Sequence, residues 1–216
     1  YIKEYLKNKT CMIKKILIIF IGETTPVDKN TKNYRYSNLE KYLLKFNYNI
    51  TRIVPNFFHL VKKKRFKNNK IIKINQKHRV VFLKNLSYSS NESILRFISY
   101  KLLSFKIKKF LSEIDKPDLI ITAIPSPDIA ISVIKYANKK KIPVILDIRD
   151  DWLNNILNRV GKFKKIANFF INQLLFDMND LSKFEFTPIC TSYIYKKSFI
   201  KYSRKFKKST VIPLGY

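Results

Sequence analysis

The densest group of reactive side chains is the segment DIRDDW at residues 147–152, which ends in the only tryptophan, Trp152. Side chains alternate along a strand, so Asp147 and Arg149 are expected on one face and Ile148 on the other. Charges that follow a buried strand are costly unless they pair with each other or with a ligand. The segment predicts either an internal brace that holds a loop or a polar rim for a substrate, and one arrangement can serve both.

A second candidate site is the loop at residues 22–26 (GETTP), which precedes Arg35 at the start of an expected helix. Backbone N–H groups around Thr24 and a helix N-terminus can hold a phosphate, and the Arg35 guanidinium can add two parallel hydrogen bonds. The alternative is an ordinary surface loop with a solvated arginine. Because the loop lacks the G-x-G-x-x-G pattern, nicotinamide and flavin cofactors are not expected.

The third candidate is the segment NFFH at residues 56–59, which follows an expected strand and contains His59, one of two histidines. An imidazole at a strand end can carry a proton or donate a hydrogen bond, although a single histidine is more often structural. The two cysteines, Cys11 and Cys190, have no metal-ligand spacing and form no disulfide framework. No metal site is predicted, and this cysteine usage suits a reducing, cytoplasmic setting.

Apolar runs of strand length define the elements that must position these residues. Residues 15–21 (KILIIFI) and 118–123 (DLIITA) are typical of strands buried on both faces. The turn PSP follows the second run, with Ser126 as the expected N-cap of a helix and a proline at its first position. That helix leads into a strand at 142–148, which completes the strand–helix–strand crossover of a parallel sheet.

The remaining segments extend this alternation. It predicts a Rossmann-like, doubly wound α/β domain with a mainly parallel sheet and helices on both faces. Ligands bind such sheets beyond the carboxyl ends of the strands, which is where the three candidate sites lie. The other expected elements are a helix from residue 36, a strand at 49–54, a basic irregular stretch at 62–79 with a short strand at 71–74, a long amphipathic helix at 93–114, helices near 162–176 and 192–203, and strands at 185–190 and 210–214.

The charge balance is extreme, with 44 basic and 15 acidic residues and a net charge of +29. A field of this sign attracts nucleic acid, anionic lipid headgroups and nucleotide diphosphates alike, while a compositional bias toward lysine would give the same count without a function. A nucleic-acid-binding module would need a concentrated basic face with stacking aromatic residues. The aromatic residues lie mainly at helical core spacings, which disfavours nucleic acid. No apolar run approaches the ~20 residues that span a bilayer.

The order of these segments is similar to that of the family 4 glycosyltransferases of the GT-B fold, and among them to bacterial O-antigen and capsule sugar transferases. The similarity is carried first by residues 117–152 (PDLIITAIPSPDIAISVIKYANKKKIPVILDIRDDW), which resemble the family's PD-strand, cleft helix and D-x-R-D-x-W segment. Weaker similarities lie at residues 33–39, 48–51, 58–66 and 211–216. The chain departs from the pattern at Thr24 and Thr25, where relatives have paired glycines, and at Asp151 beside the tryptophan.

The resemblance implies a domain organisation and an activity. Residues 1–11 would be an N-terminal extension, and residues 12–216 the acceptor-side N-terminal domain of a retaining glycosyltransferase. Its partners would be a nucleotide-sugar donor, held by a C-terminal domain absent from this chain, and a growing glycan, often on a lipid carrier at the inner face of the cytoplasmic membrane. The chain alone would be inactive. No cofactor or metal is implied, and an inert transferase fragment is the alternative.

The resemblance also assigns roles to the candidate residues. His59 would be the candidate catalytic residue, positioning the acceptor, and Arg35 would contact an anion. Basic residues around 62–67 would face anionic lipid, at ~1 kcal/mol for each well-placed cation. The expected substrate-binding crevice is lined by Thr24, Arg35, His59, Ser126, Asp147, Arg149 and Asp150.

Overall fold

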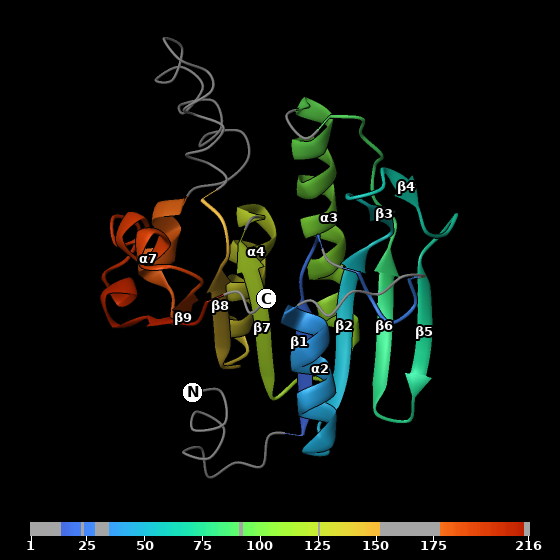
Figure 1. Cartoon of the computed structure of the whole chain (residues 1–216), viewed down its shortest axis with the longest axis horizontal. Coiled ribbons are helices and arrows are strands. Elements are labelled where there is room, and N and C mark those ends of the chain that lie inside the picture. The colour runs from blue at the N-terminus through green and yellow to red at the C-terminus, as the bar shows by residue number, and fades with distance from the viewer. Residues whose placement is uncertain are drawn as a thin grey trace.

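The computed structural model describes residues 14–22, 24–28, 35–90, 93–124, 126–151 and 178–213. It contains an eight-stranded sheet in the order β10-β9-β8-β7-β1-β2-β6-β5, in which every neighbouring pair is parallel except β5 with β6 (Figure 1). The predicted Rossmann-like fold with a mainly parallel sheet is therefore confirmed. The strands of this sheet are β1 (Lys15–Ile19), β2 (Asn49–Pro55), β5 (Lys70–Asn75), β6 (His78–Leu83), β7 (Leu119–Ile124), β8 (Val144–Ile148), β9 (Thr187–Cys190) and β10 (Thr210–Val211).

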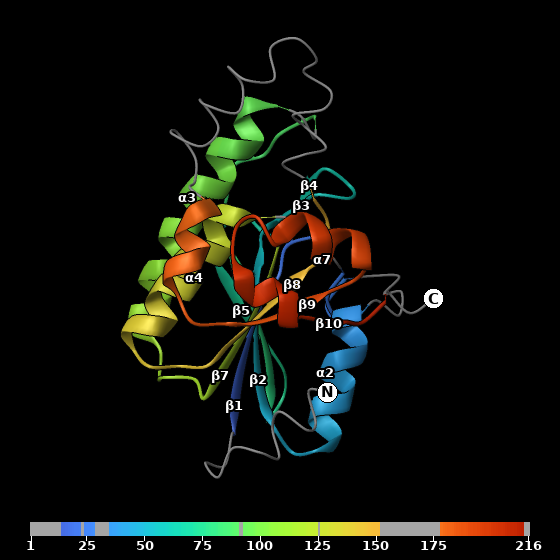
Figure 2. The same cartoon turned by 90° about the vertical axis from the view of Figure 1, so that its left-hand side faces the viewer.

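Helices cover both faces of the sheet, with α3 and α4 on one side and α2 on the other (Figure 2). A two-stranded hairpin, β3 with β4, stands beside the sheet near one end of α3 (Figure 1). None of the helices in the described ranges is long and apolar enough to cross a membrane. These elements are β3 (Phe57–Phe58), β4 (Lys63–Lys64), α2 (Arg35–Lys45), α3 (Ile94–Glu113), α4 (Pro127–Lys139) and α7 (Tyr193–Phe199), with 3-10 turns at η2 (Met178–Lys183) and η3 (Arg204–Lys208).

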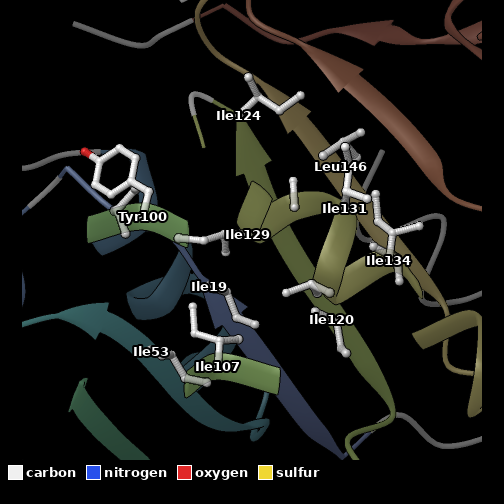
Figure 3. Packing of buried hydrophobic residues seen from close by; sticks show 14 of the residues in the cluster. Ile19, Ile53, Tyr100, Ile107, Ile120, Ile124, Ile129, Ile131, Ile134 and Leu146 are labelled. Atoms are coloured by element: carbon white, nitrogen blue, oxygen red, sulfur yellow. The ribbon is translucent and has the colours of Figure 1, made fainter. Parts of the chain in front are cut away.

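The central strands are apolar because both of their faces are covered. Every residue of β7 and of β8 is buried, which explains their near-continuous apolar sequences. On one face, Ile107 of α3 belongs to the same core cluster as Ile19 and Ile53 of the sheet (Figure 3). Burial of these side chains supplies the main driving force for docking the helices on the sheet.

Helix α4 begins where the turn chemistry predicts. Ser126 occupies the N-cap position and Pro127 the first turn, but the Ser126 side chain makes no capping hydrogen bond. The predicted N-cap position is therefore confirmed, although the hydroxyl does not take part in capping. The helix buries an apolar face formed by Ile129, Ala130, Val133, Ile134 and Ala137.

Strand β6 is the main element that the sequence analysis missed. The short strand expected at 71–74 is present as β5, but the stretch expected to be irregular runs directly into β6 between β2 and β5. Strand β6 begins with two basic residues, His78 and Arg79, which follow a lysine-rich segment. Because of them, the short apolar run at 80–83 was not recognised as a strand. His78 is nevertheless buried, because it packs within 3.7 Å of the Glu40 carboxylate.

Helix α3 also differs from expectation, because its outward face is not polar. Leu95, Ile98, Leu102 and Phe105 are all exposed there. The helix begins as predicted, with the Ser93 hydroxyl accepting a hydrogen bond from the Arg96 N–H. The helix expected near 162–176, the extension at 1–11 and Trp152 lie outside the described residues.

Candidate substrate-binding site

The centre of the candidate site is the carboxylate of Asp147, near the carboxyl end of β8. Asp147 is 1% exposed and pairs in register with Ala123 of β7 and Ile189 of β9. Its Oδ2 accepts hydrogen bonds from Arg35 Nε at 3.1 Å and from the Tyr36 hydroxyl at 3.0 Å. Burial raises the pKa of the Asp147 carboxyl, and the charges of Arg35 and Arg149 oppose this shift.

Arg35 connects three separate parts of the chain. It is the first residue of α2, and its Nη1 donates to the backbone carbonyls of Ile212 at 3.0 Å and Pro213 at 3.2 Å, which follow β10. Together with the Nε contact to Asp147, these bonds fix the start of α2 against β8 and the segment after β10. Arg35 therefore braces α2 against the sheet, a role that the sequence analysis did not assign to it.

Arg149 lies on the same face as Asp147, as the strand alternation predicted. Its guanidinium carbon is 4.6 Å from the ring centroid of Phe20 and 5.6 Å from that of Tyr36. The two rings stack on each other with centroids 4.6 Å apart. Cation–π contact with this pair holds the positive charge of Arg149 near the carboxylate at the end of the sheet.

Three buried polar atoms at this edge have no hydrogen-bond partner within the described part of the chain. They are Asp147 Oδ1, Thr24 Oγ1 and Ser126 Oγ. Thr24 is 7% exposed and Ser126 is 1% exposed. Asp147 lies at the end of β8, while Ser126 follows β7 and Thr24 follows β1. These three strands are consecutive in the sheet. A buried polar group without a partner costs about 1–3 kcal/mol, so a polar ligand or water that paired with these atoms would bind favourably.

Asp150 belongs to the side of this edge that faces α7. Burial, followed by the charges of Asp150 and Asp151, raises the pKa of the Tyr195 hydroxyl on α7. The loop itself is held by Thr191, whose N–H donates to the Ile148 carbonyl at 3.0 Å. Asp150 is half-buried and lies at the rim of the sheet edge.

His59 belongs to a different hydrogen-bond network. Its Nδ1 lies 2.9 Å from the Tyr88 hydroxyl, which lies 3.0 Å from the Tyr100 hydroxyl on α3. Arg96 Nε donates to Tyr100 at 3.2 Å. Burial and the charges of Arg96 and Lys62 lower the pKa of His59 to about 4, so the imidazole is neutral at pH 7. A neutral imidazole can accept a proton or a hydrogen bond.

The predicted residues thus fall into two groups at one edge of the sheet. Arg35, Asp147 and Arg149 are brought together around Tyr36, with Thr24 and Ser126 at the adjacent strand ends. His59 follows β2, and β1 and β7 lie between β2 and β8. The common edge agrees with the sequence analysis, while a shared crevice for His59 and the Asp147–Asp150 segment stays a prediction.

Two features of the site were not anticipated from the sequence. Tyr36 was not among the predicted site residues, yet its hydroxyl donates to Asp147. A pocket of about 200 Å³ also opens at the opposite, amino-terminal edge, lined by residues that include Lys15, Lys77 and Asp115. In the described ranges, no group of three or more His, Cys, Asp or Glu side chains is arranged to hold a metal ion.

Comparison with known proteins identifies the class of fold. No protein-family model and no curated protein matches the sequence. Among solved structures, UGT89C1 of Arabidopsis thaliana complexed with quercetin matches with a TM-score of 0.53 and 13% identity, over 94% of this chain and 51% of that one. The complex of UGT89C1 with UDP-L-rhamnose gives a TM-score of 0.51 and 13% identity, over 93% and 48%.

An α,α-trehalose-phosphate synthase (UDP-forming) from Burkholderia vietnamiensis matches with a TM-score of 0.51 and 10% identity, over 88% of this chain and 42% of that one. The chain therefore has a Rossmann-like α/β fold. More narrowly, it is the fold found in GT-B glycosyltransferases, and the chain spans about half the length of the structures that it matches.

Proposed function

We propose that this chain is the acceptor-side half of a glycosyltransferase, which moves a sugar from a nucleotide-sugar to a surface glycan. Two independent lines support the proposal. The fold is shared with glycosyltransferases about twice as long as this chain, and the segment at 117–152 resembles that of family 4 enzymes, which implies a retaining reaction on an O-antigen or capsule glycan, carried on a lipid.

The observation that carries this proposal is the set of buried polar atoms at the carboxyl ends of β1, β7 and β8 that have no hydrogen-bond partner within the described ranges. Asp147 Oδ1 can accept a hydrogen bond from a sugar hydroxyl, while Oδ2 is held by Arg35 and Tyr36. The Thr24 and Ser126 hydroxyls can donate to and accept from the same sugar. Sugars present both donors and acceptors, so they match this mixed set better than a purely anionic ligand does.

Two other residues complete the proposed acceptor site. Arg149 brings a positive charge to the edge, opposite the leaving diphosphate, and Asp150 lies at the rim. His59 is neutral at pH 7 and is proposed to hydrogen-bond the attacking acceptor hydroxyl. This role requires the acceptor to reach from β8 across β1 to the end of β2.

A leaving diphosphate is stabilised by cations and N–H donors on both sides of a cleft. In this proposal, a second nucleotide-binding domain supplies the other side, so the 216 residues alone bind acceptor but do not turn over. The proposal involves no cofactor and no metal. Placement at the inner face of the cytoplasmic membrane follows from the lipid-linked acceptor.

The proposal is tested by NMR titration of the chain with oligosaccharides from the surface polysaccharide of the producing organism, and separately with UDP. We expect amide shifts around Thr24, Ser126 and Asp147 on adding oligosaccharide. Asp147→Asn should weaken binding ~10–100-fold, since a hydrogen bond to a charged acceptor is lost. Asp115→Asn, at a carboxylate whose side chain is 84% exposed, is the matched control. Shifts confined to the pocket at the amino-terminal edge, or no shifts with any oligosaccharide, would contradict the proposal.

A further inference from the structure

Arg65 lies in the basic stretch at 62–67, but its side chain turns toward the protein rather than toward solvent. Only 8% of this side chain is exposed, whereas Lys63 and Lys64 on β4 are exposed. The guanidinium donates from Nε to Asp28 Oδ1 at 2.6 Å and from Nη2 to Asp28 Oδ2 at 2.9 Å. Two parallel bonds to one carboxylate fix the orientation of the two groups as well as their separation.

The Asp28 carboxylate belongs to the loop that carries Thr24. It also accepts hydrogen bonds from the backbone N–H of Thr25 at 2.6 Å and from the Thr25 hydroxyl at 2.9 Å. The Asp28 N–H donates back to the Thr25 carbonyl at 3.0 Å, which closes a turn directly after Thr24. Burial alone would raise the pKa of Asp28, but the hydrogen bonds from Arg65 and Thr25 outweigh it and lower this pKa below its ordinary value. The carboxylate is therefore ionised at pH 7.

Arg65 also closes the base of the hairpin that carries His59. The Arg65 backbone N–H donates to the Asn56 carbonyl at 2.8 Å, just outside the β3–β4 pairing. Its Nη1 donates to the carbonyl of Pro55, at the end of β2, at 3.1 Å. Its guanidinium carbon lies 3.9 Å from the ring centroid of Phe58, the residue before His59. One residue thus contacts the end of β2, the hairpin and the loop after β1.

Apolar side chains surround this ion pair. Val27 of the loop and Phe66 of the segment after β4 pack against the same core cluster of β2 and β6. The Phe66 ring meets the Phe82 ring of β6 edge to face, with centroids 4.9 Å apart. Water screens charges less in such surroundings, so the attraction between Arg65 and Asp28 is stronger than that of an exposed pair.

We infer that Arg65 is a positioning residue of the candidate site, which holds the Thr24 loop and the His59 hairpin as one unit. The role of this unit in acceptor binding rests on the proposed function, whereas its contacts do not. Strands β1 and β2 are neighbours in the sheet, so the loop and the hairpin leave adjacent strand ends. A fixed separation between the Thr24 hydroxyl and the His59 imidazole is what one ligand that contacts both would require.

The first test measures the pKa values of the two histidines by NMR in Arg65→Lys. Lysine keeps the positive charge but cannot form two parallel bonds. The change should loosen the hairpin and move the pKa of His59 from about 4 toward its ordinary value of 6.5, because burial is the main cause of its low pKa. The pKa of His78, outside the hairpin, should stay at about 4.

Amide hydrogen exchange tests the loop that carries Thr24. In Arg65→Lys, the Thr25 N–H should exchange at least ~10-fold faster, because its acceptor Asp28 loses the guanidinium that holds it. The Ala130 N–H within α4 should keep its exchange rate. A general loss of stability would instead speed exchange at both amides.

Oligosaccharide titration tests whether Arg65 acts through Thr24. Arg65→Lys should weaken binding about 10-fold in the wild type but only about 3-fold in a Thr24→Ala background, where one of the groups it positions is gone. In an Asp147→Asn background the full factor should remain, because that carboxylate is held by Arg35 and Tyr36 instead.

The matched control is Arg79→Lys on β6, where Nε donates to the Thr51 hydroxyl at 2.9 Å. The same substitution there should leave the His59 pKa, the Thr25 exchange rate and oligosaccharide binding unchanged. Asp28→Asn is the second variant, because it keeps an oxygen for Thr25 but removes the charge that pairs with Arg65. It should give the same pattern as Arg65→Lys, including where Arg65→Lys does not fold.

Several outcomes would overturn the inference. They are an unchanged pKa of His59, equal changes at His59 and His78, an unchanged exchange rate at Thr25, and equal losses of binding in the wild-type and Thr24→Ala backgrounds. Equal effects of Arg65→Lys and Arg79→Lys would also overturn it. The pKa and exchange measurements need no sugar, so a wild type that binds no oligosaccharide would contradict the proposed function and leave the coupling of the two segments decided by these measurements.

Discussion

Two of the arginine–carboxylate pairs in the described part of the chain differ in what surrounds them. Arg52 of β2 donates to Glu40 of α2 at 3.2 Å, with side chains 0% and 2% exposed. Arg35 donates to Asp147 at 3.1 Å, with side chains 16% and 1% exposed. The first pair lies between a helix and the middle of the sheet, and the second lies where strands end. Enclosure on all sides suits a structural role, whereas a partly exposed arginine at the ends of the strands suits ligand binding.

His78 accentuates the difference. Its Nε2 lies 3.7 Å from Glu40 Oε2, and burial and the charge of Arg52 lower its pKa to about 4. The first pair therefore has a neutral imidazole beside it, and its carboxylate is committed to Arg52. The second pair has the cation of Arg149 nearby. The comparison teaches that one type of salt bridge can serve two purposes. The Arg52–Glu40 pair anchors α2, whereas the Arg35–Asp147 pair orients a carboxylate at the candidate site.

The largest effect is expected from Glu40→Gln. This change leaves the Arg52 charge buried without its counterion, which costs about 3–5 kcal/mol of unfolding free energy. Urea unfolding followed by circular dichroism measures it. Glu113→Gln, at an exposed position of α3, should change the free energy of unfolding by less than about 0.5 kcal/mol. A loss below about 1 kcal/mol for Glu40→Gln would show that the enclosed pair is not a structural anchor.

The second prediction concerns pH. The folded pKa of His78 is about 4, below the ordinary value of 6.5, so the unfolded state binds more protons between these values. Stability should therefore fall as pH decreases from 6.5 to 4, by up to about 1.4 kcal/mol per pH unit for one proton. His59 adds a smaller part because it is half-buried and more screened.

Asp128 has the opposite effect on stability over this pH range, because burial raises its pKa to about 6 and the folded state then binds more protons than the unfolded state. The measurement is the free energy of unfolding at several pH values for the wild type, His78→Gln and His59→Gln. His78→Gln should reduce the loss of unfolding free energy between pH 6.5 and pH 4 more than His59→Gln does. Equal curves for all three proteins would contradict the assignment of the slope to the enclosed pair.

Asp147→Asn should have a smaller effect on stability than Glu40→Gln, about 1–2 kcal/mol, because Arg35 keeps its two carbonyl partners and partial access to water. Asp147→Asn should weaken oligosaccharide binding more than Glu40→Gln does. Both variants are measured by unfolding and by oligosaccharide titration. Glu40→Gln should lose more stability, and Asp147→Asn should lose more binding. If Glu40→Gln weakened binding as much as Asp147→Asn at a temperature where both are folded, the division between the two pairs would be wrong.

The smallest effect on stability is expected from Ser126→Ala. Removing a buried hydroxyl that has no hydrogen-bond partner among the described residues should leave the unfolding free energy unchanged or raise it by up to about 1 kcal/mol. Binding of the sugar should weaken about 5–10-fold, since one hydrogen bond is lost. Ser192→Ala is the contrast, because that hydroxyl caps α7 by accepting from the Tyr195 N–H at 3.2 Å and its loss should cost ~1 kcal/mol. A clear destabilisation by Ser126→Ala would imply a structural partner for this hydroxyl.

Sequence patterns predicted the fold well where one rule dominated. The apolar runs of β1, β7 and β8 and the proline-initiated α4 identified the parallel crossover, because strands covered on both faces have little choice of composition. Strand alternation also predicted that Asp147 and Arg149 share a face. These features depend only on neighbours along the chain.

The features that the sequence analysis missed depend on distant partners. Arg52 interrupts an apolar strand and looks solvent-facing, yet it is fully buried because Glu40 on α2 neutralises it. His78 marks the start of β6 only once Glu40 is known to lie beside it. The link from Arg35 to the carbonyls after β10 spans more than 170 residues, and no local pattern encodes it.

The edge strand β5 has a consequence for the behaviour of this protein in concentrated solution. It runs against its neighbour and exposes five of its six side chains, two of which are lysines. An unpaired strand edge is a template on which another chain can add, and lysines along it discourage that addition. The antiparallel strand β5 therefore ends the sheet on this side with exposed lysines. These charges should help to keep molecules from adding strand to strand and forming fibres.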